Sequence, residues 1–422
     1  MLDSAYSGGL ELHVPELFNV CSPDDARALL CNRITPLARA VTCPLEEALE
    51  RVTAVALCSP VDLPAFPRST MDGYALRATD SYGASEGLPA YLRLIGEVPM
   101  GQQAGLRVGR GELAKVHTGG MIPDGADAVV MVENTQLVDE TTLEVVRPVA
   151  IGENVIPIAE DIHRDAPVLP QGHVLRPQDL GALAGVGIVR IEVVARPLVA
   201  IMATGDEVVE AGSAPAPGQV RDINTYTISS LVRHSGAEPH SYGIVPDQFE
   251  RLCACARRAL DENDALIISA GSSVSTRDMT AAAIEGLGAP GILVHGVSMH
   301  PGKPTILAMA GEKPVFGLPG NPVSTMIAFQ LFVAPALARL LGTVSPVHRM
   351  VRAHLTHNVA SIPGREDYVQ ARLEQRGREI WAEPVFGKSN LIYTMVRADG
   401  VIRVPLDRAG LYAGDVVDVD LF

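Results

Sequence analysis

Residues 198–207 read Leu-Val-Ala-Ile-Met-Ala-Thr-Gly-Asp-Glu, an apolar run of strand length that ends in a polar turn. The same layout recurs three more times in the C-terminal half, where turns follow the apolar runs 265–269, 292–297 and 314–316. Helical stretches separate these runs, and strands that alternate with helices predict a largely parallel, doubly wound α/β sheet. We expect the four turns to meet at the carboxyl edge of that sheet, where such folds bind ligands.

The rest of the chain predicts three further domains around an α/β domain over 196–346. Residues 22–55 and 150–195 are expected to form one α+β domain, with helical spacing of apolar residues over 45–52 and a helix over Pro177–Val186. Residues 56–149 contain short β-rich runs separated by glycine and proline, which predict an inserted β domain. Residues 347–422 alternate as strands do and predict a small C-terminal β-barrel or sandwich.

Composition excludes one class of partner. The 422 residues carry a net charge of −15, and only 4% of them are aromatic. Nucleic-acid binding needs a basic face, and single-stranded nucleic acid needs aromatic stacking platforms, so we expect no nucleic-acid partner. An anionic substrate would have to be held by a few local cations against the overall field.

The six cysteines show no CxxC pair and no zinc-ligand spacing, which predicts buried free thiols in a reducing compartment. The first residues contain neither the basic nor the apolar region of a signal peptide. The longest uncharged stretch, 314–338, is interrupted by a proline- and glycine-rich turn and by Pro335, whereas a membrane span needs ~20 continuous apolar residues. We therefore expect a cytoplasmic protein with no membrane partner.

Four carboxylates fall on loops at the predicted edge of the α/β sheet: Asp206, Glu207, Asp247 and Asp278. Oxygen ligands gathered there suit Mg²⁺. Asp247 and Asp278 could instead be helix caps, since each precedes a predicted helix, and Asp222 and Asn224 are expected to be caps. Glu207 has no evident helix to cap, which favours a functional role.

Two of the turns suit an anion. Asn321 and Pro322 are placed as N-cap and first residue of an apolar helix, whose free N–H groups would face the cleft. Lys303 lies between two prolines on a stiff turn, so its ammonium is aimed instead of sampling solvent. An ordinary capped helix and an exposed turn lysine would show the same local patterns.

At these residues the chain resembles the molybdopterin molybdenumtransferases, the family that includes MoeA-type enzymes and the gephyrin E domain. The resemblance runs from about residue 22 to the end. Its most specific motifs are Ser69-Thr70-Met71-Asp72-Gly73-Tyr74-Ala75, Thr204-Gly205-Asp206-Glu207, Pro301-Gly302-Lys303-Pro304 and Gly317-Leu318-Pro319-Gly320-Asn321-Pro322-Val323-Ser324.

The resemblance implies a MoaB-like α/β domain, an inserted β domain, an elongated α+β linker domain and a C-terminal β-barrel. It also implies a homodimer whose active site lies between protomers. The implied reaction cleaves adenylylated molybdopterin as molybdate is inserted at the dithiolene, giving molybdenum cofactor and AMP with Mg²⁺. A molybdopterin adenylyltransferase is then expected upstream.

The resemblance and the turns together assign the site residues. The expected catalytic residues are Glu207, Asp247, Asp278 and Asp72, the last supplied by the partner protomer, and the first three are also the expected metal ligands. The expected substrate-binding residues are Thr118, Ser269, Gly271, Ser272, Lys303, Pro319, Gly320, Asn321, Pro322 and Ser324. The expected molybdate-binding residues are His300, Lys303, Arg365 and Ser389.

One departure from the family bears on specificity. The family usually has lysine or arginine before Pro301-Gly302, and this chain has His300. A neutral imidazole holds an oxyanion less firmly than a permanent cation, so a tungstate-inserting variant stays open. Two further functions stay open as well: a molybdopterin adenylyltransferase, whose fold resembles the α/β segment alone, and a non-catalytic scaffold that binds the cofactor.

Overall fold

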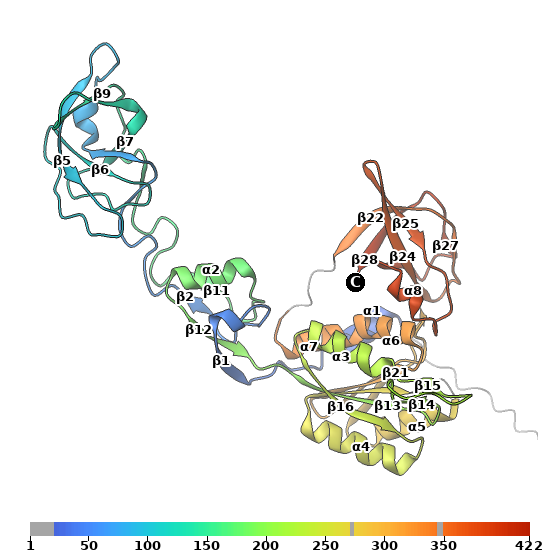
Figure 1. Cartoon of the computed structure of the whole chain (residues 1–422). Coiled ribbons are helices and arrows are strands. Elements are labelled where there is room, and N and C mark those ends of the chain that lie inside the picture. Colours follow the sequence, from blue (N-terminus) through green and yellow to red (C-terminus); the bar gives the residue numbers. More distant parts are fainter. Residues whose placement is uncertain (1–20, 271–273, 344–348) are drawn as a thin grey trace, which may run out of the picture. The chain divides into compact units, whose positions relative to one another are not determined.

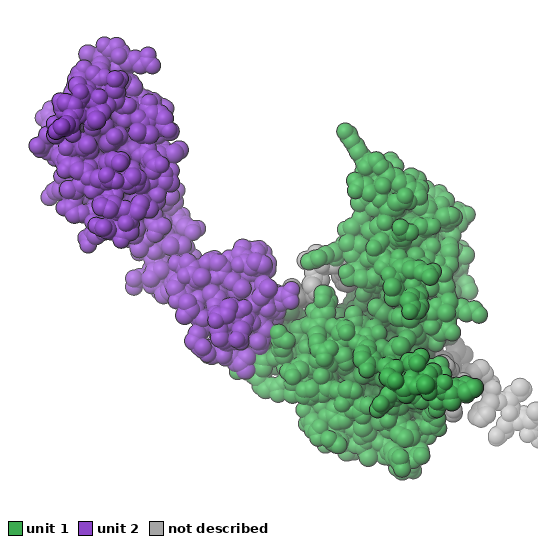
Figure 2. Space-filling view, viewed as in Figure 1, with its two compact units in different colours: residues 1–40, 194–422 green, residues 41–193 purple. Residues whose placement is uncertain are grey.

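The computed structural model describes residues 21–270, 274–343 and 349–422 (Figure 1). The chain divides into two compact units (Figure 2). One unit contains the chain up to Ala40 together with Val194–Phe422, and the other is Val41–Val193.

The first unit is built on a six-stranded sheet with the order β16-β13-β17-β21-β20-β18. Its strands are β13 (Leu198–Thr204), β16 (Glu238–Val245), β17 (Ala265–Ala270), β18 (Pro290–His295), β20 (Ile306–Ala310) and β21 (Lys313–Pro319). Only β20 runs antiparallel to its neighbours, so the other five strands share one direction. The strands β13, β17, β18 and β21 therefore all end at the same edge, as the sequence predicts.

Helices cover both faces of this sheet, which confirms the doubly wound α/β prediction. The helices are α1 (Pro23–Cys31), α3 (Asn224–His234), α4 (Phe249–Glu262), α5 (Val274–Glu285), α6 (Pro322–Ala328) and α7 (Ala334–Leu340). Alternate residues of β13 point to opposite cores: Val199 and Ile201 pack with α1, α3, α6 and α7, whereas Ala200 and Met202 pack with α4 and α5. The α1 helix thus completes the core of the α/β sheet.

The apolar helix that begins at Pro322 is interrupted just before Pro335 but continues beyond it. A π-helical turn over Phe329–Val333 joins α6 to α7, and such a turn accommodates the missing N–H of a proline. Among the described residues, the resulting helix Pro322–Leu340 is the one long and apolar enough to cross a membrane, and 72% of its 18-residue apolar window is buried inside the protein. Its length and apolar character are accounted for by packing in the core.

The C-terminal segment is a closed five-stranded barrel, which confirms a barrel over a sandwich. The strands β22 (Met350–Leu355), β24 (Glu366–Arg376), β25 (Glu379–Pro384), β26 (Gly400–Val404) and β28 (Val416–Leu421) form it. They pair in the order β24-β25-β22-β28-β26, and β26 returns to β24. A short strand, β19 (Met299–His300), joins the barrel edge by pairing in parallel with β24, which brings the turn after β18 against the barrel.

The second unit contains an inserted β domain whose entering and returning chains pair with each other. Its six-stranded sheet has the order β7-β4-β6-β5-β9-β8. The strands are β4 (Gly73–Leu76), β5 (Ala90–Glu97), β6 (Glu112–Val116), β7 (Ala128–Met131), β8 (Thr135–Leu137) and β9 (Thr142–Val145). The entering strands β2 (Leu57–Cys58) and β3 (Arg68–Ser69) pair antiparallel with the returning strands β11 (Pro167–Leu169) and β10 (Val155–Ile156).

The remainder of this unit corrects one helix prediction and confirms another. Residues 45–52 are not an α-helix: the strand β1 (Ala40–Pro44), which pairs with β12 (Arg190–Val194), is followed by a single 3₁₀ turn over Leu45–Glu47. Their apolar side chains pack under α2 (Pro177–Gly185) without continuing a helix, so the spacing was fortuitous. The α2 helix begins at Pro177 as predicted.

All six cysteines are free, as predicted, but they are not all buried. Cys43 is buried, Cys58 is exposed and the other four are half-buried. Burial alone therefore does not protect every thiol in this chain.

The hydrogen bonds at the start of α2 predict that the protein loses stability at acid pH. Asp179 is 5% exposed and accepts hydrogen bonds from the Arg176 guanidinium at 2.9 Å, while His173 Nε2 lies 2.7 Å away. The Arg176 hydrogen bonds are the main cause that holds the pKa of Asp179 well below its usual range. A depressed folded-state pKa contributes stability above the unfolded pKa, about 4, and that contribution is lost as the pH falls toward the folded value.

Asp179→Asn should therefore destabilise the protein by about 1–2 kcal/mol at pH 7, and the difference from wild type should shrink as the pH falls from about 4 to 2. Urea denaturation followed by circular dichroism at several pH values measures it. Asp165→Asn, at an exposed site in the same unit, is the control. A difference that stays constant over the whole pH range would contradict the account.

Candidate functional site

Two neighbouring cavities lie at the edge where the strands of the α/β sheet end. The first, which we call the glutamate cavity, has a volume of about 350 Å³ and is formed by the turns after β13, β17 and β21. Its lining includes Thr204, Glu207, Asp222, Asn224, Ser269, Gly320, Asn321, Pro322 and Asn390. The predicted residues Glu207, Ser269, Gly320, Asn321 and Pro322 are thus brought together.

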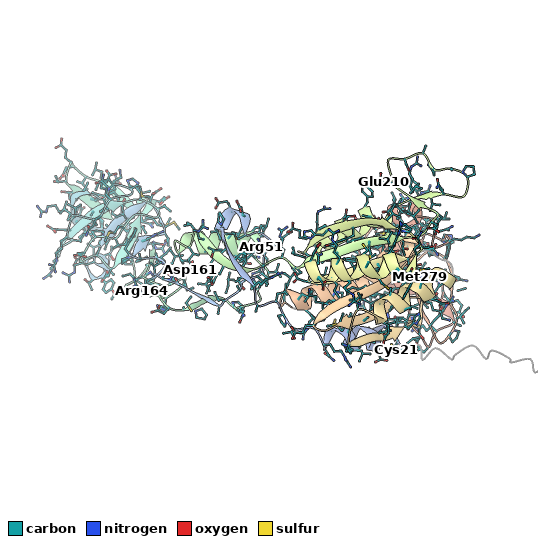
Figure 3. All side chains as sticks on the ribbon, turned by 90° about the horizontal axis from the view of Figure 1, so that it is seen from below. Cys21, Arg51, Asp161, Arg164, Glu210 and Met279 are labelled. Atoms are coloured by element: carbon teal, nitrogen blue, oxygen red, sulfur yellow. The ribbon has the colours of Figure 1, made fainter. Side chains whose placement is uncertain are left out.

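Glu207 is held in this cavity by the backbone beneath it. It is half-buried in the turn between β13 and β14 (Val208–Val209), with no helix beginning there to cap. Gly205 has φ +142, and a Cβ added to it would lie 2.8 Å from Glu207 Oε2. Only glycine permits both this backbone conformation and the close approach of the carboxylate. The chain continues to Glu210 and a loop that projects from this unit (Figure 3).

Asp247 and Asp278, the two carboxylates that could have been helix caps, do not cap helices. Asp247 does not cap α4: its Oδ1 accepts a hydrogen bond from Thr204 Oγ1 at 2.7 Å, which ties the turn after β16 to the end of β13. Its backbone N–H donates to Asp206 Oδ1 at 3.1 Å. Asp278 lies inside α5 and is exposed, so it is not a cap either. Within the described ranges, no group of three His, Cys, Asp or Glu side chains is close enough to hold a metal ion.

Asn224 is a site residue that the sequence did not reveal. It was expected to cap a helix, yet its amide group donates two hydrogen bonds of 2.8 Å, one to Ser269 Oγ and one to the Gly320 carbonyl. Asp222 does cap, since it accepts from the Thr225 N–H at 3.0 Å. The 7% exposed Asn224 side chain therefore fixes the turns after β17 and β21 to each other inside the glutamate cavity.

The second cavity, the lysine cavity, has a volume of about 220 Å³. It is lined by His300, Pro301, Gly302, Lys303, Pro304, Pro319, Gly320, Asn321, Ser324 and Ser389. Gly320 and Asn321 line both cavities, so the two adjoin. All of the expected molybdate-binding residues except Arg365 lie here. Gly302 has φ +112, a conformation that favours glycine and turns the chain so that Lys303 is exposed at the cavity.

The start of α6 differs in detail from the predicted anion site. Asn321 is the N-cap residue, but its side-chain amide donates to Ser389 Oγ at 3.0 Å instead of capping. The Val323 N–H donates to the Ser389 carbonyl at 3.1 Å, and Pro322 has no N–H. Two of the first helical positions therefore offer no free donor, and Lys303 is the main positive group of the cavity wall.

Arg365 does not line the lysine cavity, but it contacts Asp367, the carboxylate that also contacts His300 of the cavity wall. Its guanidinium is 3.3 Å from Asp367, and His300 Nδ1 is 2.9 Å from the same side chain. Asp367 thus contacts both Arg365 and His300 and holds the two side chains near each other. Gly271 and Ser272, which were predicted to bind substrate, lie outside the described residues.

Asp72 and Thr118 meet in the second unit. The Thr118 backbone N–H donates to Asp72 Oδ1 at 2.8 Å, and this hydrogen bond is the main cause that keeps the pKa of Asp72 below its usual range. His117 Nδ1 lies 3.8 Å from the same oxygen. A Cβ at Gly73 would lie 2.0 Å from the Val130 carbonyl oxygen, so glycine is required beside Asp72. Asp72 is an exposed, ionised carboxylate at neutral pH.

Carboxylate, hydroxyl and lysine groups in adjoining cavities at the strand ends of a doubly wound α/β sheet are typical of proteins that bind phosphorylated or oxyanion ligands. Three models of known protein families match the chain. The MoeA N-terminal region (domain I and II) matches residues 21–187, the probable molybdopterin binding domain matches 200–339, and the MoeA C-terminal region (domain IV) matches 352–422.

Similar proteins agree over nearly the whole chain. A putative molybdopterin biosynthesis protein of Methanocaldococcus jannaschii is 36% identical, covering 89% of this chain and 90% of the relative. The molybdopterin molybdenumtransferase of Bacillus subtilis is 31% identical, covering 89% and 88%. The crystal structure of the molybdopterin biosynthesis MoeA protein from Pyrococcus horikoshii OT3 superimposes with a TM-score of 0.84 at 31% identity, covering 96% of this chain and all of that one. The chain belongs to the MoeA family of molybdopterin molybdenumtransferases.

Proposed function

We propose that this enzyme of molybdenum cofactor biosynthesis inserts molybdate into adenylylated molybdopterin and releases AMP and molybdenum cofactor. Family membership makes it a transferase that handles molybdopterin. The observation that carries the finer proposal is the adjacency of the two cavities, which share Gly320 and Asn321. One cavity offers a carboxylate and hydroxyls for a nucleotide diphosphate, and the other offers Lys303 and His300 for an oxyanion.

Different side chains would bind the oxyanion in one cavity and the diphosphate in the other. Lys303, Ser324 and Ser389 would hold the oxyanion beside the pterin, because ammonium and hydroxyl donors match its oxygens. Asn224 donates to both Ser269 and Gly320 and would fix their positions around the diphosphate. Holding the two substrates in adjoining spaces converts their reaction into an intramolecular one.

A divalent cation fits the glutamate cavity in one specific way. Mg²⁺ commonly binds one or two carboxylates together with substrate phosphates, and Glu207 is the carboxylate that lines the cavity. Asp247 and Asp278 remain predicted as contacts of its water ligands. When bound, the cation supplies charge neutralisation at the diphosphate.

AMP release tests the proposal. Purified protein, adenylylated molybdopterin and Mg²⁺ should release AMP in proportion to added molybdate. Release that is independent of any oxyanion would favour simple hydrolysis, and release with tungstate in preference to molybdate would favour a tungstate-inserting enzyme. Formation of adenylylated pterin from ATP would favour an adenylyltransferase, and ligand binding without turnover would favour a scaffold.

We also propose that the enzyme is a homodimer in which Asp72 serves the glutamate cavity of the partner protomer. Asp72 is exposed, and Thr118 fixes it in an ionised state, which suits a group that acts on a second chain. The adenylylated substrate would come from a molybdopterin adenylyltransferase, and the reaction is proposed to take place in the cytoplasm.

Mixed dimers test the shared site. Asp72→Asn and Glu207→Gln should each be nearly inactive alone. After unfolding and random reassociation of equal amounts, about half of the dimers are mixed and each has one intact site, so activity should return to roughly a quarter of wild type. A mixture that stays inactive would place both residues in the same protomer's site. Asp161→Asn, at an exposed position of the second unit, replaces Asp72→Asn in the control mixture.

A further inference from the structure

His300 has an unusually well-defined partner for an exposed residue. It ends the short strand β19, which pairs with β24 so that His300 and Asp367 are direct neighbours across the two strands. His300 Nδ1 lies 2.9 Å from Asp367 Oδ1. The Asp367 side chain is only 5% exposed, whereas that of His300 is 60% exposed and lines the lysine cavity.

Asp367 is held in place from its other sides as well. Arg365 lies 3.3 Å from both carboxylate oxygens, through Nε and a terminal nitrogen, and the Ser361 hydroxyl donates to Oδ2. These contacts hold the buried carboxylate in a fixed position beside His300. The charged groups near the imidazole are Asp367, with Arg365 bound to it, on the barrel side, and Lys303, which lines the same cavity.

This contact decides which ring nitrogen of His300 carries a proton. A carboxylate oxygen 2.9 Å from Nδ1 requires a proton on that nitrogen. In the neutral imidazole, Nε2 is then left with a lone pair, which accepts hydrogen bonds and repels an anion. Only the protonated ring presents an N–H at Nε2. A lysine or arginine at this position would donate at any physiological pH.

We propose that His300 is an oxyanion-binding residue that donates to the bound oxyanion only when protonated, and that Asp367 is the positioning residue that fixes its tautomer. The inference rests on the proposed function, because it takes the lysine cavity as the molybdate site. Binding then takes up one proton: the dianion and a neutral His300 combine with a solvent proton to give the complex with imidazolium. Molybdate affinity is thereby linked to pH at this residue.

Calorimetric titration of the full-length protein with sodium molybdate tests this inference. Measurements at pH 6, 7 and 8, each in two buffers of different ionisation enthalpy, give both the affinity and the number of protons taken up. We expect proton uptake on binding and an affinity that falls by up to about tenfold for each unit of rising pH, because one proton is taken up with each molybdate.

Two variants distinguish the effect of His300 from that of the other residues of the lysine cavity. His300→Lys should bind molybdate with little pH dependence and little proton uptake between pH 6 and 8, because its donor stays charged. Asp367→Asn should reduce proton uptake, because the ring can then present an N–H at Nε2 while neutral. His240→Gln, on the edge strand β16, should behave as wild type.

The outcomes distinguish the two proposals. Tight molybdate binding with constant affinity and no proton uptake in wild type would overturn the role of His300 and leave the proposed function standing. Equal pH dependence in wild type and His300→Lys would also overturn it. Absence of molybdate binding in both proteins at every pH, together with absence of molybdate-dependent AMP release, would overturn the function as well.

Discussion

Glu207→Gln is expected to lower molybdate-dependent AMP release by roughly 100-fold or more while the protein remains folded. Glutamine has the same shape as glutamate but lacks the charge that would hold a cation and face the diphosphate. The turn leaves room for either side chain, because Gly205 lies directly beneath the carboxylate. The loss should appear in kcat more than in KM, since the charge acts on the transferring group.

Steady-state AMP release with saturating adenylylated molybdopterin measures this loss. Glu210→Gln is the matched control: it removes the same charge three residues away, on the exposed loop that follows β14. Wild-type activity in Glu207→Gln would remove this residue from the mechanism. Loss of folding in that variant would mean that the carboxylate serves the structure instead.

Arg403→Met is expected to cause the largest loss of stability, roughly 2–4 kcal/mol in the free energy of unfolding. Arg403 on β26 donates to Glu366, which is 1% exposed, and to Asp24 Oδ2 in α1 at 3.0 Å. Tyr368 also donates to Glu366, and burial together with this carboxylate raises the pKa of Tyr368. Removing the guanidinium leaves a buried carboxylate without its cation, which costs more than the pair contributes.

Urea denaturation of the whole protein measures this effect. Arg352→Met is the control, because Arg352 pairs with Asp418 on the exposed barrel surface, with side chains 83% and 59% exposed, and should change stability by less than about 0.5 kcal/mol. The double variant Arg403→Met with Glu366→Gln should regain part of the lost stability. Equal effects at Arg403 and Arg352 would contradict the account of a buried charge.

The strand-edge arrangement could be predicted because it depends on local sequence. Apolar runs followed by turns define where strands end, and Pro322 marks a helix start, so the meeting of Glu207, Lys303 and Asn321 at one edge follows from the order of elements. The inserted β domain and the barrel follow from alternation and turn residues in the same way.

The features that the sequence did not predict depend on contacts between residues distant in sequence. Asn224 looks like a helix cap until Ser269 and Gly320 are brought to it from 45 and 96 residues away. His300 looks like a weak replacement for a cation until Asp367 is placed beside it by the pairing of β19 with β24. The helical spacing over 45–52 is overridden by packing under α2 and by strand pairing of the residues before it. Such contacts are set by tertiary structure, which no local pattern contains.

A single-turnover experiment tests whether diphosphate cleavage is coupled to metal insertion. Excess enzyme, adenylylated molybdopterin, Mg²⁺ and molybdate are mixed, and AMP and pterin-bound molybdenum are measured in the same samples. The two products are expected to appear together in equal amounts, and neither should form without molybdate. AMP that appears without pterin-bound molybdenum would contradict the claim that these adjoining cavities couple diphosphate cleavage to metal insertion.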